Sequence, residues 1–169
     1  VVTLVMMAAA AWEWGRLNGL GGGASIGLGA ACVVLCGLGW AAGWLHLDGF
    51  ALDDSCGPLA LAMAGAAVAA GVPVSLEPPS LAGLPARRER LSLLPELDLL
   101  VGRPDEVAAA GAILGAAPRA MVTHDGAGPV RWSGPDRSVS VDVPPAPDLD
   151  TLGAGDRFAG GLLAACLRG

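Results

Sequence analysis

The residues best suited to chemistry lie near the end of the chain, in the segment Asp150-Thr151-Leu152-Gly153-Ala154-Gly155-Asp156. This glycine-rich loop leads into an apolar helix. The N-terminus of a helix presents unpaired N–H groups and about half a positive charge, which together favour a bound phosphate. The small residues at 153–155 would let a phosphoryl group approach those N–H groups.

Asp156 would stand in the first turn of that helix. A carboxylate does not help simple phosphate binding, but it suits a base that removes a proton from an attacking hydroxyl. The N–H groups would then stabilise the charge that develops on the transferred phosphoryl group. A glycine turn followed by an aspartate is also an ordinary helix start, because the acid complements the helix dipole. The spacing alone leaves both interpretations open.

The elements that would position this loop are short strands alternating with longer helices, a pattern that predicts an α/β domain with a largely parallel sheet. Strands are predicted at residues 44–49, 72–76, 98–101, 120–123, 130–132 and 139–143. Helices are predicted at residues 58–70, across the charged run 87–90, from 104 to about 115, and from about 154 onward. We expect the charged run to be a solvated helix surface. Ligands of such sheets bind beyond the carboxyl ends of the strands.

Composition excludes several other classes of protein. The chain has 169 residues, 53% of them apolar, with ten basic and sixteen acidic side chains and a formal charge of −6. Such a chain is too apolar for intrinsic disorder. Every basic residue is an arginine, and the net acidic balance argues against binding to a nucleic-acid backbone.

Residues 1–43 differ from the rest, because they are rich in Gly, Ala and Trp and carry only Glu13 and Arg16 as charges. The apolar run from Leu28 to Leu45 just reaches the length of a membrane helix. Its glycines disfavour a helix, and no arginine cluster flanks it. We therefore expect a segment of unknown role rather than a membrane span, in a cytoplasmic protein.

The segment from Asp150 to Gly161 resembles the C-terminal signature of the PfkB (ribokinase-like) family of carbohydrate kinases. Every fixed position of that signature agrees. Four earlier segments resemble the family more weakly and occur in the family's order, at residues 45–50, 71–78, 98–106 and 122–128. The resemblance covers residues 44–169, which would form the nucleotide-binding and catalytic part. It implies a three-layer αβα fold with a mostly parallel sheet.

The resemblance also implies roles for individual residues. Asp156 would be the catalytic base, and the backbone N–H groups of Gly153, Ala154 and Gly155 would form the anion hole. Glu106 would help to organise Mg²⁺ through water. The remaining implied residues are Thr123 and Gly128 at the nucleotide, and Asp150 and Thr151 beside a monovalent cation that some relatives hold.

Three positions depart from the family pattern. Arg103 stands in place of an asparagine, Asp125 in place of a glycine, and Glu77 in place of an aspartate. The family's sugar-recognition motif and lid have no recognisable counterpart in residues 1–43. We therefore expect a ribokinase-like domain that is incomplete at both ends and exposes apolar edges, through which copies could associate as a homo-oligomer.

The resemblance thus implies ATP- and Mg²⁺-dependent phosphorylation of a small-molecule sugar or sugar-like hydroxyl. One alternative is a nucleotide-binding remnant, or pseudokinase, that phosphorylates no sugar. A third hypothesis is a membrane-associated protein anchored through residues 17–47.

Overall fold

Short apolar runs form the strands of one six-stranded sheet. The computed structural model describes residues 19, 21–23, 26, 43–126, 128–144 and 154–168. The strands occur in the order in which they follow one another along the chain. They are β1 (Leu45–Asp48), β2 (Val74–Glu77), β3 (Leu99–Gly102), β4 (Ala120–Thr123), β5 (Val130–Ser133) and β6 (Ser138–Val141).

The first four strands are parallel, whereas β5 runs antiparallel to β4, and β6 antiparallel to β5. Parallel strands need crossover connections, and helices supply them. The connecting helices are α3 (Gly57–Ala69), α4 (Leu84–Leu93) and α5 (Pro104–Gly111). The short 3₁₀ helix η1 (Gly49–Leu52) follows β1 directly, and α6 (Ala154–Cys166) follows the last strand.

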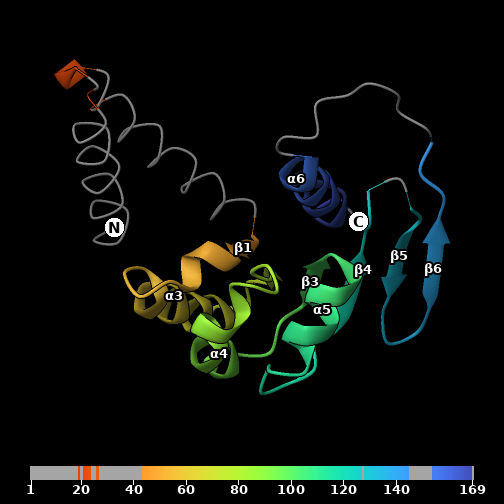
Figure 1. Cartoon of the computed structure of the whole chain (residues 1–169), viewed down its shortest axis with the longest axis horizontal. Coiled ribbons are helices and arrows are strands. Elements are labelled where there is room, and N and C mark those ends of the chain that lie inside the picture. The colour runs from red at the N-terminus through yellow and green to blue at the C-terminus, as the bar shows by residue number, and fades with distance from the viewer. Residues whose placement is uncertain are drawn as a thin grey trace. The chain divides into compact units, whose positions relative to one another are not determined.

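The helices cover the two faces of the sheet (Figure 1). The core of the first face joins α3, α4 and α5 to alternate strand residues such as Leu47, Leu76 and Leu100. On the other face, Phe158 and Leu162 of α6 pack against a cluster centred on β3 and β4. The result is the predicted three-layer αβα fold with a mostly parallel sheet.

The helix interfaces follow from residue spacing. In α3 the buried residues are Gly57, Ala60, Ala64 and Ala67, which lie three or four positions apart and so share one face. Strand β3 is buried along its whole length. Such burial on both faces is typical of a central parallel strand and explains its continuous apolar sequence.

The chain divides into two compact units, Val1–Gly43 and Trp44–Gly169. Almost all of the first unit lies outside the described residues. Among the residues that the structure does describe, no helix is both long and apolar enough to cross a membrane.

Candidate active site

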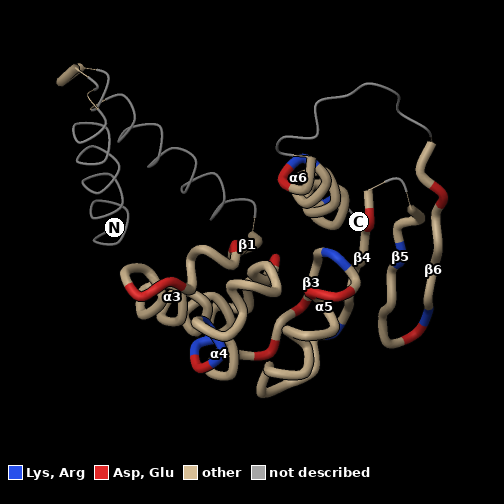
Figure 2. The backbone as a smooth tube through the Cα atoms, viewed as in Figure 1, with Lys and Arg blue, Asp and Glu red and all other residues tan. Residues whose placement is uncertain are grey.

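Acidic side chains meet where the parallel strands end. Asp48 is the last residue of β1 and Glu77 the last residue of β2, and the register of the two strands places them side by side. Glu106 lies in the first turn of α5, and Asp156 in the first turn of α6. In Figure 2, red acidic positions lie near the labels of β1, α5 and α6. The carboxyl ends of parallel strands are where ligands of α/β proteins bind.

Close backbone packing holds the first two acidic loops together. A Cβ atom on the buried Gly49 would lie 2.3 Å from the backbone nitrogen of Pro79. A Cβ atom on Gly102 would lie 3.1 Å from Cδ of Pro78. The loop after β2 therefore packs between Gly49, which follows β1, and Gly102, which ends β3. Larger side chains at these two positions would not permit so close an approach of the loop. Asp48 also caps η1, because its Oδ1 accepts a hydrogen bond from the N–H of Phe50 at 2.8 Å.

Among these acids, Glu77 is the one whose pKa is raised by the most neighbouring charges. Partial burial raises the pKa of its carboxyl, and the charges of Asp48, Asp156 and Glu106 raise this pKa further. A carboxylate surrounded by like charges is typical of a site that binds a cation or takes up a proton.

The start of α6 approaches the same group. A Cβ atom on Gly155 would lie 3.4 Å from Oε1 of Glu77, an ordinary contact distance, so the start of the helix lies next to this carboxylate. One turn later the ring of Phe158 packs on that of His124, with 4.6 Å between ring centroids. Ala159 is buried. These contacts hold the first turn of α6, which carries the exposed Asp156, beside Glu77.

The structure thus brings four of the predicted site residues to one edge: Ala154, Gly155, Asp156 and Glu106. Asp150, Thr151 and Gly153 lie outside the described residues.

Glu106 occupies the third position of α5, with Arg103 as the N-cap residue. Burial raises the pKa of the Glu106 carboxyl, while a hydrogen bond from the backbone N–H of Arg103 lowers it. This arrangement is half of a capping box. The Arg103 side chain lies between two acids, 3.6 Å from Asp105 and 3.7 Å from Asp125. Two of the positions that depart from the family pattern, Arg103 and Asp125, therefore contact each other.

The donor set at this edge consists of carboxylate oxygens, the ligands that Mg²⁺ prefers. Within the described ranges no three such side chains converge closely enough to hold a metal ion by themselves. Mg²⁺ usually retains several waters and binds through one or two carboxylates together with substrate phosphates. Among the described residues, these carboxylates therefore fit a Mg²⁺ ion that keeps most of its water ligands, and not a dedicated protein cage.

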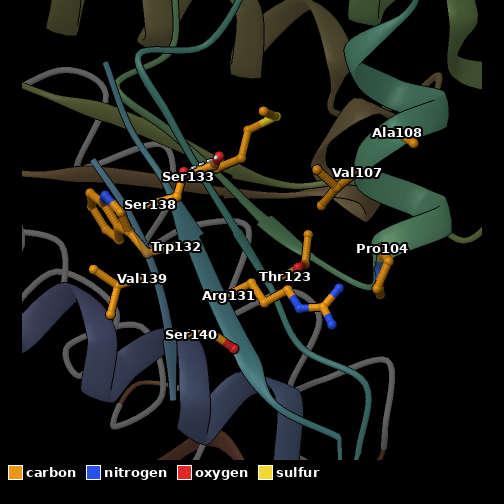
Figure 3. Close-up of a pocket in the computed structure, with 11 residues that line it drawn as sticks. Pro104, Val107, Ala108, Thr123, Arg131, Trp132, Ser133, Ser138, Val139 and Ser140 are labelled. Atoms are coloured by element: carbon orange, nitrogen blue, oxygen red, sulfur yellow. Dashed lines mark hydrogen bonds between the residues drawn. The ribbon is translucent and has the colours of Figure 1, made fainter. Parts of the chain in front are cut away.

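Thr123 and Gly128 belong to the connection between β4 and β5. Gly128 closes a turn by donating its N–H to the carbonyl oxygen of Asp125 at 2.8 Å, and Gly126 adopts a positive φ of 53° within that turn. Thr123 lines a hollow of about 540 Å³ between α5 and the last three strands. Figure 3 shows the side chains of Thr123 and Arg131 close together in this hollow, near Pro104.

Sequence reasoning missed two groups of contacts at the site. His46 and Trp44 both contact the buried Ser75, and only the register of β1 and β2 reveals this.

The expectation that residues 87–90 form a purely solvated surface is wrong for two arginines. Arg87 pairs with Asp53, and Arg90 pairs with Asp54 at 2.6 Å, because η1 returns the chain over α4.

Comparison with known proteins identifies the family. The model of the pfkB family carbohydrate kinases matches residues 41–169. No curated protein matches the sequence.

Among solved structures, fructokinase from Xylella fastidiosa with bound ATP is 22% identical, with a TM-score of 0.58, covering 73% of this chain and 44% of the fructokinase. A protein from E. coli described as a ribokinase II, in complex with ATP and Mg²⁺, is 20% identical, with a TM-score of 0.61. The match covers 73% of this chain and 45% of the E. coli protein. Adenosine kinase from Schistosoma mansoni in complex with 2-fluoroadenosine is 19% identical, with a TM-score of 0.56. The match covers 73% of this chain and 44% of the adenosine kinase.

At these identities the structural likeness shows the fold, and this chain spans less than half the length of each of the three. The family match covers about three quarters of the sequence and includes the helix that carries Asp156. The chain therefore belongs to the pfkB family of carbohydrate kinases.

Proposed function

We propose that residues 44–169 are the nucleotide-binding and catalytic part of a kinase that transfers a phosphoryl group from ATP to a hydroxyl of a sugar or sugar-like molecule. The observation that carries this proposal is the position of Asp156. It stands in the first turn of α6, directly after small residues, and this turn lies beside Glu77 at the carboxyl end of β2. Membership of the family supports the same chemistry.

In this proposal Asp156 accepts the proton of the acceptor hydroxyl as the hydroxyl oxygen attacks. A base must lie within hydrogen-bonding reach of that proton, and an exposed carboxylate on a fixed helix turn meets this requirement. The backbone N–H groups of Gly153, Ala154 and Gly155 stabilise the negative charge that develops on the transferred group. Small side chains are needed there because a larger one would separate the N–H groups from the phosphoryl oxygens.

Glu106, through water, would hold Mg²⁺, and Thr123 and Gly128 would line the nucleotide site. Asp150 and Thr151 would lie beside a monovalent cation. When bound, ATP would supply the γ-phosphoryl group, with ADP as the leaving group, and Mg²⁺ would supply a positive charge that offsets the mutual repulsion at Glu77.

The test of this assignment is Asp156→Asn. This substitution keeps the size and polarity of the side chain but removes the base. We expect kcat for ATP-dependent phosphorylation, measured across a panel of sugars, to fall by about 10²- to 10⁴-fold. Affinity for ATP, measured by equilibrium binding, should change little because the N–H groups remain.

The matched control is Asp136→Asn, because Asp136 is an exposed aspartate between β5 and β6. This control should turn over like the wild type. A wild-type rate in Asp156→Asn would show that Asp156 is not the base.

A second candidate function is nucleotide binding without phosphorylation. The pairing of Arg103 with Asp125 favours it, because Arg103 stands where the family pattern has an asparagine and so alters the surroundings of Glu106, the expected Mg²⁺ residue. Measurable ATP affinity, with no ADP release on any sugar of the panel, would support this candidate over the kinase.

A further inference from the structure

The hollow between α5 and the last three strands is lined by both polar and apolar side chains. Its volume of about 540 Å³ is typical of small-molecule sites. Strand side chains point to alternate faces, so alternate residues of β4, β5 and β6 share the face that borders the hollow. The strand register sets these residues in two rows, with Thr123, Arg131 and Ser140 in one and Met121, Ser133 and Ser138 in the other.

Arg131 gives the hollow a positive charge. Among the described residues that line the hollow it is the one with a formal charge, in a chain with a net charge of −6. Four other arginines form ion pairs, whereas Arg131 has no acidic partner within the described part of the chain. Its guanidinium points toward Pro104 at the start of α5 (Figure 3). Such a guanidinium can bind a phosphate or a carboxylate through two parallel hydrogen bonds.

Hydroxyl groups lie opposite this arginine and farther along the hollow. Ser140 is the direct partner of Arg131 in the register of β5 and β6. The Oγ atoms of Ser133 and Ser138 lie 3.3 Å apart in the second row. A phosphate that gives two of its oxygens to the guanidinium keeps a further oxygen for the Ser140 hydroxyl, whereas a carboxylate has no third oxygen to offer. The charged end of the hollow therefore favours a phosphate.

The rest of the lining includes an apolar surface. Pro104, Val107 and Ala108 lie three or four positions apart and so share one face of α5. On the sheet, the side chain of Met121 is 37% exposed, although it belongs to an inner strand. An organic group that covered these residues would remove apolar surface from water. The hollow thus combines a phosphate-binding end with a surface for an apolar group.

The hollow is separate from the acidic edge of the candidate active site. Helix α6, which carries Asp156, packs on the other face of the sheet, where Phe158 contacts the cluster that contains Val122. Val122 is the residue of β4 between Met121 and Thr123, and its side chain points away from theirs. None of the four acids at the carboxyl edge lines the hollow. A ligand in the hollow would therefore lie across the sheet from α6.

We propose that the hollow is a second ligand site, which binds a small organic phosphate through Arg131 and Ser140 and covers its apolar part with Met121 and α5. This site goes beyond the proposed phosphoryl transfer, in which Arg131 and Ser140 have no assigned role. Thr123 lines the hollow and is also expected at the nucleotide, so the two sites would adjoin at the end of β4.

Calorimetric titration of the whole chain with phenyl phosphate tests the site, because this probe joins a phosphate to an apolar ring. We expect saturable binding at a single site. Phenol and inorganic phosphate should bind more weakly, since each lacks one half of the probe. Benzoate should also bind more weakly, because its carboxylate has no third oxygen for Ser140.

Two substitutions act on the two halves of the site. Arg131→Gln keeps a polar side chain but removes the charge, and should weaken phenyl phosphate binding about ten- to hundredfold, as for loss of a hydrogen bond to a charged group. Ala108→Leu, at an exposed position of α5, should weaken binding by filling the apolar side of the hollow. The matched control is Arg137→Gln, because Arg137 is exposed between β5 and β6 and does not line the hollow. This control and Asp156→Asn should bind the probe like the wild type.

Each alternative result has a definite meaning. Absence of saturable binding would overturn the inference, as would wild-type affinity in Arg131→Gln. Phenol or benzoate that bound as tightly as phenyl phosphate would overturn the assignment of a phosphate ligand. Displacement of the probe by ATP, or loss of binding in Asp156→Asn, would place the probe in the nucleotide site and also overturn it. A chain that binds the probe as expected but phosphorylates no sugar would instead refute the proposed function and leave the second site standing.

Discussion

The contact between Gly49 and Pro79 leads to a prediction about how the acidic edge is held together. In Gly49→Ala, the new Cβ atom would lie 2.3 Å from the nitrogen, 2.6 Å from the Cα atom of Pro79 and 2.8 Å from the carbonyl carbon of Pro78. All three are backbone atoms, so no side chain can rotate away. The loops after β1 and β2 would have to separate by about 1 Å to reach ordinary contact at 3.4 Å.

Overpacking of this kind costs about 1–3 kcal/mol. The matched control is Gly65→Ala, because Gly65 lies inside α3 and a Cβ atom added there would have no neighbour within 4 Å outside its own helix turn. There the substitution should stabilise the protein by about 0.5–1 kcal/mol, since alanine is the better helix former. The same chemical change thus has opposite signs at the two positions.

Chemical denaturation measures both effects as changes in the unfolding midpoint at constant slope. In a thermal scan the Gly49→Ala variant should melt about 3–9 °C below the wild type, at about 3 °C per kcal/mol for a chain of this size. The reasoning would be refuted if Gly49→Ala were as stable as the wild type. It would also be refuted if both variants shifted in the same direction.

Two further predictions concern charged side chains. Arg90→Ala should cost about 1–2 kcal/mol in urea unfolding, because Arg90 crosses Gly57 to donate to the Leu52 carbonyl oxygen at 3.1 Å. Arg88→Ala, on the exposed side of the same helix, should stay within about 0.5 kcal/mol. Glu77→Gln should stabilise the protein at pH 7, since the raised pKa makes ionisation costlier in the folded state than in the unfolded chain. That gain should vanish as the pH falls below 4.5, where the carboxyl is protonated in both states. A gain independent of pH would contradict this cause.

The local elements could be predicted because their signals are local. Alternating apolar segments, with glycine and proline at their ends, indicated β1 to β6 and α3 to α6 within a few residues. The short helix η1 was missed because four residues leave no periodicity to detect. The strand β6, with every residue exposed, was recognisable only through its β-branched residues and flanking turns.

The contacts between loops could not be predicted in the same way. Arg90 and Leu52 are 38 positions apart, and Trp44 and Ser75 are 31 positions apart. Nothing in a linear pattern specifies which loop an arginine reaches or which strand a serine pairs with. Those contacts depend on strand order, on register and on the direction of each crossover.

Periodicity predicted the fold class of this chain, and the consecutive residues 150–161 carried its resemblance to the family and predicted the helix start with Asp156. The side chains that surround that aspartate were decided by tertiary packing. Register placed Glu77 beside Asp48, and the packing of α6 brought Asp156 near enough for its charge to act on Glu77. The same register buried Ser75 against His46. Burial and like charges act through space, and their effects on Glu77 exist only once distant segments have packed together.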